Sequence, residues 1–81
     1  MNMINIRLES LTDGQLLSSL KSETCPNCGG SKKERMTLCS RDYYQLSDPM
    51  RKALYKRIGQ GYREAFVAAL TQLGSTAAAL D

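Results

Sequence analysis

Three cysteines and one aspartate in this chain have the spacing of a metal site. Cys25 and Cys28 are separated by two residues, Cys39 follows after ten more, and Asp42 lies three positions beyond it. The resulting C-x2-C-x10-C-x2-D pattern is a four-cysteine zinc motif in which a carboxylate replaces the last sulfur. Zinc accepts both kinds of ligand in a tetrahedral structural site. We therefore predict one structural zinc ion bound by Cys25, Cys28, Cys39 and Asp42.

The length of the chain makes such a metal site useful for folding. A domain of 81 residues buries only about 60–65% of the surface that its unfolded chain exposes, and small domains often need a staple. Three cysteines are an odd number, which disfavours a disulfide framework. Residues 1–7 lack the layout of a secretory signal, and no apolar run is long enough to span a membrane. We therefore expect residues 1–81 to form a single zinc-binding domain in a reducing cytoplasm, without a membrane partner.

The cysteines and the aspartate also have alternative interpretations. Reduced thiols can be ordinary core residues, although a turn rich in proline and glycine is a poor place for a core. Cys-Pro-x-Cys is similar to the glutaredoxin active site, but that chemistry needs a lowered thiol pKa at a helix N-terminus. Gly29-Gly30 opposes a helix directly after Cys28, and Cys39 would then have no role. Asp42 can instead cap a helix, with water or Glu34 completing the metal site.

A clear helix signal lies at residues 11–21. Thr12 can cap this helix, and Gln15 three positions later completes a capping box. Leu11 and Leu16 occupy the two positions of a hydrophobic staple. We predict that the helix buries one apolar face, formed by Leu16, Leu17 and Leu20.

A helical hairpin is predicted over residues 48–73. Its first helix starts at Ser47-Asp48-Pro49, because a capping side chain, an acidic first turn and an early proline all favour a helix start. This helix should continue to Ile58. The second helix extends from Tyr62 to Leu73, and its apolar stripe is broad enough to serve as core or as an interface for a homodimer or a protein partner.

The remaining segments give weaker signals. Residues 1–10 alternate between apolar and polar side chains and fit either a short edge strand or a loose arm. Residues 34–38 can form one short strand that returns the chain to Cys39. Residues 74–81 begin with glycine and are rich in alanine, so we predict a frayed tail, with helix as the alternative conformation.

The cysteine region resembles known zinc proteins. Cys25-Pro26-Asn27-Cys28-Gly29 is similar to the zinc knuckle of treble-clef and zinc-ribbon proteins. With the Cys39-x2-Asp42 pair and Tyr43-Tyr44, it also resembles small zinc-finger proteins encoded by temperate phages, over roughly residues 23–73. The resemblance implies a small α+β zinc-stabilised domain: a knuckle and short hairpin over residues 25–42, a second ligand pair at a helix start, and two helices after it. Asp42 departs from the usual fourth cysteine.

Basic residues are concentrated in the middle of the chain. The formal net charge is +3, but residues 32–63 hold nine of the eleven basic residues and only three acidic ones. A local basic surface attracts phosphates, mainly through sequence-independent contacts. Lysine and arginine on a helix are also common as its solvated face. The residues predicted to bind nucleic acid are Lys32, Lys33, Arg35, Arg41, Arg51, Lys52, Tyr55 and Lys56.

Two classes of function follow from these features. Three thiolates make zinc a weak Lewis acid, and the chain has no histidine and so lacks the His-x-Glu pair of a zinc deaminase. We therefore expect a non-enzymatic protein without a small-molecule substrate. The first class is a nucleic-acid-binding zinc domain, and the second is a phage-type accessory protein that binds and modulates a host protein machine as inhibitor or adaptor. A glutaredoxin-like redox protein is the remote alternative.

Overall fold

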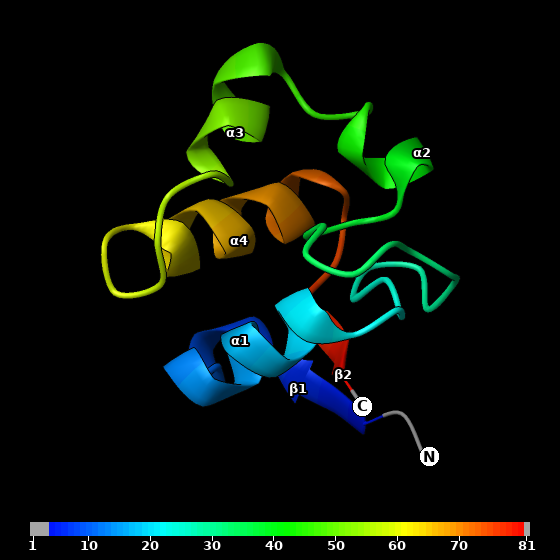
Figure 1. The fold of residues 1–81 in the computed structure, drawn as a ribbon, viewed down its shortest axis with the longest axis vertical. Helices are drawn as coiled ribbons and strands as arrows, with labels where there is room; N and C mark the ends of the chain where they lie inside the picture. Colours follow the sequence, from blue (N-terminus) through cyan, green and yellow to red (C-terminus); the bar gives the residue numbers. More distant parts are fainter. Residues whose placement is uncertain (1–3, 81) are drawn as a thin grey trace.

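A computed structural model describes residues 4–80 of the chain as a small α+β fold (Figure 1). In chain order its elements are β1 (Ile4–Arg7), the 3-10 helix η1 (Leu8–Ser10), α1 (Asp13–Lys21), α2 (Ser40–Tyr43), α3 (Asp48–Ala53), α4 (Tyr62–Gln72) and β2 (Ala77–Leu80). Helix α4 crosses the middle of the molecule, with α3 on one side of it and α1 and the sheet on the other (Figure 1). None of these helices is long and apolar enough to cross a membrane.

The sheet joins the two ends of the described chain. β1 and β2 are antiparallel, in a register that pairs Ile4 with Leu80 and Arg7 with Ala77. Of the two conformations predicted for residues 1–10, the strand is the one found at residues 4–7. Met1–Met3 and Asp81 lie outside the described residues.

The frayed tail predicted for residues 74–81 is wrong, because residues 77–80 form β2. The Ala78 side chain is 0% exposed, and its methyl group is small enough for the strand to lie directly against the core. The Ala79 N–H donates to the Pro26 carbonyl at 2.8 Å. The strand therefore has backbone partners both in β1 and in the cysteine-containing turn.

Helix α1 begins as the sequence predicts. The Gln15 N–H donates to Thr12 Oγ1 at 3.2 Å, and the Thr12 N–H donates to Gln15 Oε1 at 2.9 Å. The predicted capping box is therefore confirmed. Leu16 is buried as expected, but the Leu17 side chain is 44% exposed, which corrects its assignment to the core.

Helix α3 is shorter than predicted, because it ends at Ala53 rather than at Ile58. After Ala53 the chain tightens into hydrogen bonds between residues three apart. The Tyr55 N–H donates to the Lys52 carbonyl at 3.1 Å, and the Lys56 N–H donates to the Ala53 carbonyl at 3.2 Å. This tight turn ends the α-helical hydrogen-bond ladder and leads the chain toward α4.

Helix α4 ends in a Schellman motif built on Gly74. The Ser75 N–H donates to the Leu70 carbonyl at 2.8 Å, and the Gly74 N–H donates to the Thr71 carbonyl at 3.0 Å. Gly74 has a φ of 87°, a left-handed conformation that glycine adopts without a Cβ penalty. The motif turns the chain sharply out of α4 and directs it into β2.

Helix α4 also supplies the centre of the core. The ring centroids of Tyr62 and Phe66 lie 6.0 Å apart, and the Tyr62 hydroxyl is hydrogen-bonded to Thr37 Oγ1 at 3.0 Å. Burial raises the pKa of Tyr62, and the hydrogen bond to Thr37 offsets this only in part. The predicted stripe of α4 packs within the chain itself, through the buried side chains of Tyr62, Ala65, Phe66, Ala69 and Leu70.

The strand predicted at residues 34–38 is wrong. Arg35 has a φ of 67°, in the left-handed region that a strand does not use. Its N–H donates to the Leu20 carbonyl at 2.8 Å. The segment is therefore a turn held against the C-terminal end of α1.

Candidate metal centre

Residues 25–30 form a tight turn that carries the first two cysteines. An isolated antiparallel bridge between Thr24 and Ser31 closes this turn, in place of the short hairpin predicted within residues 25–42. Inside the turn, the Cys25 N–H donates to the Gly30 carbonyl at 2.7 Å. The Gly30 N–H points at the Cys28 sulfur, 3.4 Å away.

Helix α2 carries the other two candidate ligands. Cys39 is its N-cap residue, and Asp42 lies three positions later on the same face of the helix. The Tyr43 N–H donates to the Cys39 carbonyl at 2.9 Å and so closes the first helical turn. The Cys39 N–H points at the Cys25 sulfur at 3.5 Å, which joins α2 directly to the turn.

The turn at residues 25–30 and helix α2 together bring all four predicted ligands close to one another. One ligand atom from each of Cys25, Cys28, Cys39 and Asp42 lies within 4.8 Å of all the others. The sulfur atoms of Cys28 and Cys39 are 3.7 Å apart. Cys25 and Asp42 are buried, whereas Cys28 is exposed and Cys39 is half-buried. The four side chains can therefore hold a metal ion at the edge of the core.

Hydrogen bonds and burial set the protonation of the cluster without a metal. Burial raises the pKa of the Cys25 thiol to about 12, although backbone N–H groups partly offset this effect. Burial likewise raises the pKa of Cys39. Burial also acts to raise the pKa of Asp42, but hydrogen bonds from Asn27 and from the cysteines outweigh it and hold the pKa below its ordinary value. A carboxylate therefore faces protonated thiols, and the Cys25 thiol donates to Asp42 Oδ2 at 3.3 Å.

Asn27 is a further residue of the site, and the sequence motif does not reveal it. Its Nδ2 donates to Asp42 Oδ2 at 3.1 Å. Its Oδ1 accepts a hydrogen bond from the Ser75 hydroxyl, so the same amide connects the turn to the segment before β2. Asparagine between two cysteines in a turn is explained by its turn propensity alone. Only the fold shows that it orients the carboxylate.

The geometry bears on two of the alternatives for these residues. The Asp42 carboxylate faces Cys25 and Asn27, and the group of candidate ligands does not include Glu34. Thiol redox chemistry needs a lowered thiol pKa, whereas burial raises the pKa of Cys25. The residues after Cys25 form a turn and not the first turn of a helix. Both observations argue against a glutaredoxin-like site.

Several residues of the predicted nucleic-acid set lie around Tyr55. A hollow of about 330 Å³, here called the tyrosine hollow, is lined by Tyr43, Tyr44, Asp48, Arg51, Lys52 and Tyr55. A neighbouring groove of about 420 Å³, here called the leucine groove, has a lining that includes Leu17, Leu20, Arg35, Tyr55, Lys56 and Arg57. Tyr55 lines both. The structure therefore brings Arg35, Arg51, Lys52, Tyr55 and Lys56 to adjoining surfaces.

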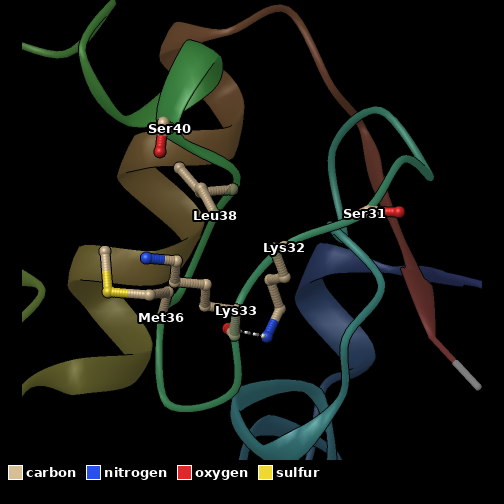
Figure 2. A pocket seen from close by; sticks show the side chains of 6 residues that line it. All are labelled: Ser31, Lys32, Lys33, Met36, Leu38 and Ser40. Atoms are coloured by element: carbon tan, nitrogen blue, oxygen red, sulfur yellow. Dashed lines mark hydrogen bonds between the residues drawn. The ribbon is translucent and has the colours of Figure 1, made fainter.

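The other predicted basic residues lie elsewhere. Lys33 lines a separate cleft of about 430 Å³ with Met36, Leu38 and Ser40 (Figure 2). Arg41 is exposed on α2. Lys32 borders the same cleft as Lys33, but Figure 2 shows its nitrogen directed to the Lys33 carbonyl.

Backbone carbonyls enclose the ammonium group of Lys32, so this residue is not part of the exposed basic surface. The residue is only 7% exposed. Its Nζ donates to the carbonyls of Leu20 and Lys33, each at 3.4 Å, and to the carbonyl of Ser22. Burial lowers the pKa of Lys32, while the negative charges of nearby acidic groups act in the opposite direction. Lys32 was predicted to contact phosphate, but its ammonium group instead binds carbonyls at the C-terminal end of α1.

Comparisons with known proteins give no match to this chain. No protein-family model, no curated protein and no solved structure is significantly similar to it. The fold and the cluster by themselves define a small α+β domain with a candidate metal centre of three cysteines and one aspartate. The likeness to phage zinc-finger proteins remains a prediction from the motif.

Proposed function

We propose that this chain is a non-enzymatic domain in which a structural zinc ion supports a nucleic-acid-binding surface. The donor set favours zinc, because soft thiolates with one carboxylate suit this ion in a tetrahedral site. Two sulfurs bound to one tetrahedral zinc are about 3.8 Å apart, and the Cys28–Cys39 separation of 3.7 Å matches that spacing. Four protein ligands leave no open coordination position, as expected of a structural site. When bound, zinc crosslinks the turn at residues 25–30 to α2.

Substitution of Asp42 should change zinc retention in opposite directions. Asp42→Cys supplies a fourth thiolate and should retain zinc longer against a chelator than the parent does. Asp42→Ala removes one ligand, and we expect at least about a tenfold loss of zinc affinity, since even outer hydrogen-bond partners of metal ligands contribute 10- to 100-fold.

The measurement is chelator competition with a chromogenic zinc indicator. Asp48→Ala is the matched control, because Asp48 is an exposed aspartate outside the cluster. Equal zinc retention by the parent, Asp42→Cys and Asp42→Ala would show that Asp42 is not a ligand.

The proposal that this domain binds nucleic acid depends on one observation: basic side chains line the surfaces on both sides of Tyr55. The tyrosine hollow and the leucine groove meet at this residue, and five basic side chains line them: Arg35, Arg51, Lys52, Lys56 and Arg57. Asp48 is the acidic residue in their lining, and it forms an ion pair with Arg51. Such an excess of positive charge attracts a polyanion and releases its counterions on binding.

The salt dependence of binding tests this proposal. The zinc-loaded parent should bind a labelled oligonucleotide with a log–log salt slope that reflects its phosphate contacts. In the triple variant Arg51→Gln, Lys52→Gln, Lys56→Gln, each lost contact should reduce the magnitude of that slope by about 0.7 on a single strand or 0.9 on duplex DNA. Affinity should fall about equally for unrelated sequences, because phosphate contacts carry no base information.

A second triple variant controls for net charge. This control variant carries Arg7→Gln, Lys21→Gln and Arg63→Gln. It removes the same charge at exposed positions that line neither the tyrosine hollow nor the leucine groove. This control variant should keep most of the log–log salt slope that the parent shows. A parent that binds no nucleic acid at low salt would contradict the proposal, as would equal losses in the two triple variants. Either result would favour the docking of a host protein.

A further inference from the structure

Three of the four tyrosines of the chain gather on one surface between α2 and α3. Tyr43 and Tyr44 stand at the end of α2, and Tyr55 follows α3 in the chain. All three line the tyrosine hollow. The Tyr44 residue is 70% exposed and Tyr55 is 77% exposed. The hollow thus presents aromatic surface to solvent instead of burying it in the core.

Contacts among the side chains position these rings. The rings of Tyr43 and Tyr44 meet edge to face, with centroids 5.4 Å apart and planes at 82°. The Tyr43 hydroxyl donates to the Tyr55 hydroxyl at 3.1 Å, which links the end of α2 to the turn after α3. The Arg51 guanidinium lies 5.6 Å from the centre of the Tyr44 ring. The rings are therefore held in place, which lowers the entropy lost when a ligand stacks on them.

The same surface carries positive charge beside its rings. Arg51 and Lys52 line the tyrosine hollow, and Lys56 lines the adjoining leucine groove next to Tyr55. Aromatic rings beside a cationic track are the combination that recognises single-stranded nucleic acid, because bases stack on the rings while phosphates contact the cations. A duplex offers phosphates to the same cations but keeps its base faces stacked inside.

We infer that the tyrosine hollow binds unpaired nucleotides, with bases stacked on Tyr44 and Tyr55 and phosphates near Arg51 and Lys52. This inference rests on the proposed function and specifies its ligand: a single-stranded segment of nucleic acid is bound in preference to a duplex. Stacking is available to every base, so the preference concerns strandedness more than sequence.

Aromatic substitutions test the inference on the zinc-loaded full chain. The probes are a labelled oligothymidine of about 12 nucleotides, a length within the range bound by small single-strand modules, and a DNA hairpin duplex with the same number of phosphates. Binding is measured by fluorescence anisotropy. Tyr44→Ala and Tyr55→Ala should each weaken binding of the oligothymidine by about 5- to 150-fold, and should leave duplex binding nearly unchanged.

Phenylalanine variants are the matched controls. Tyr44→Phe keeps the ring face, so it should bind the oligothymidine within about twofold of the parent if stacking provides the contact. Tyr55→Phe keeps its ring face but loses the hydrogen bond from Tyr43, so it should bind more weakly than Tyr44→Phe and more tightly than Tyr55→Ala. The alanine variants should keep the parental salt slope, because a tyrosine ring neutralises no phosphate. Zinc content and circular dichroism verify that each variant is folded.

Three outcomes separate this inference from the proposed function. If the alanine variants bind the oligothymidine as the parent does, while the Arg51, Lys52 and Lys56 triple variant does not, the phosphate-binding function stands and the stacking inference fails. If the alanine variants weaken duplex and single strand equally, the inference also fails, because the rings then support the surface without reading base faces. If the parent binds neither probe at low salt, both fail.

Discussion

Removal of zinc with a chelator is expected to unfold this protein. Coupled zinc binding in small domains supplies about 10–16 kcal/mol of apparent free energy, whereas a native domain is stable by only about 5–15 kcal/mol in total. The proposed site also lies at a junction of the core. Cys25 is a buried member of the hydrophobic cluster, and the Pro26 carbonyl accepts a hydrogen bond from Ala79 of β2. Loss of the metal should therefore release both the turn and the strand that is bonded to it.

The loss of zinc should depend on pH with a definite sign. A cysteine in the unfolded, metal-free chain has a pKa of about 8.5, and where the metal-free site is still folded, burial raises the pKa of Cys25 to about 12 and also raises the pKa of Cys39. These thiols are therefore protonated near neutral pH and must lose their protons when zinc binds. Because the metal-free state holds more protons, lowering the pH shifts the equilibrium toward it, and zinc should be released more readily in acid.

Circular dichroism and thermal melting of the chelated protein provide the measurement. The helical signal should fall on chelation and return when zinc is added in excess. The same chelator already saturated with zinc is the control, and Cys25→Ser should behave as the chelated parent does. A metal-free protein that keeps its helical signal and its cooperative melting transition would refute the structural role of zinc.

Placing a charge at Ala78 should destabilise the protein strongly. The Ala78 side chain is 0% exposed in β2 and belongs to the core cluster. An aspartate there must bury a carboxylate without a partner, which costs several kcal/mol or forces the strand out of place. We expect Ala78→Asp to lose at least about 3 kcal/mol of stability. In a domain of this size that loss lowers the melting temperature by more than about 12 °C.

Thr76→Asp is the matched control, because Thr76 is exposed just before β2. It introduces the same charge two positions away and should shift the melting temperature of the zinc-loaded protein only slightly. If both variants melted at the temperature of the parent, residues 77–80 would be a loose tail after all.

The parts of the fold that the sequence predicts are those decided by local interactions. The capping box at Thr12 and Gln15 involves residues three apart, so the sequence pattern alone predicts it. The strand β2 depends on distant partners instead. Alanine has low strand propensity, and residues 77–80 form a strand only because β1 and Pro26 supply their hydrogen bonds.

The same distinction separates the two candidate sites. The spacing of the three cysteines and Asp42 predicts a metal cluster, because each pair of ligands is held by one short local element. The burial of the Lys32 side chain could not be predicted from the spacing of residues in the sequence. Its enclosure requires the carbonyls of Leu20 and Ser22 at the end of α1 to meet a loop that follows the cysteine turn. Asn27 was missed for a similar reason, since its partners Asp42 and Ser75 come from distant parts of the chain.

The pairing of β1 with β2 also determines how this domain can be tethered. Residues 4 and 80 are paired in the sheet, so both ends of the described chain leave the fold at the same place. In Figure 1 that place is at the far end of the long axis from α3 and α2. A linker, label or neighbouring domain joined at either end therefore starts away from the helices that border the tyrosine hollow. Both ends are suitable points for immobilising the protein with that surface left open to a ligand.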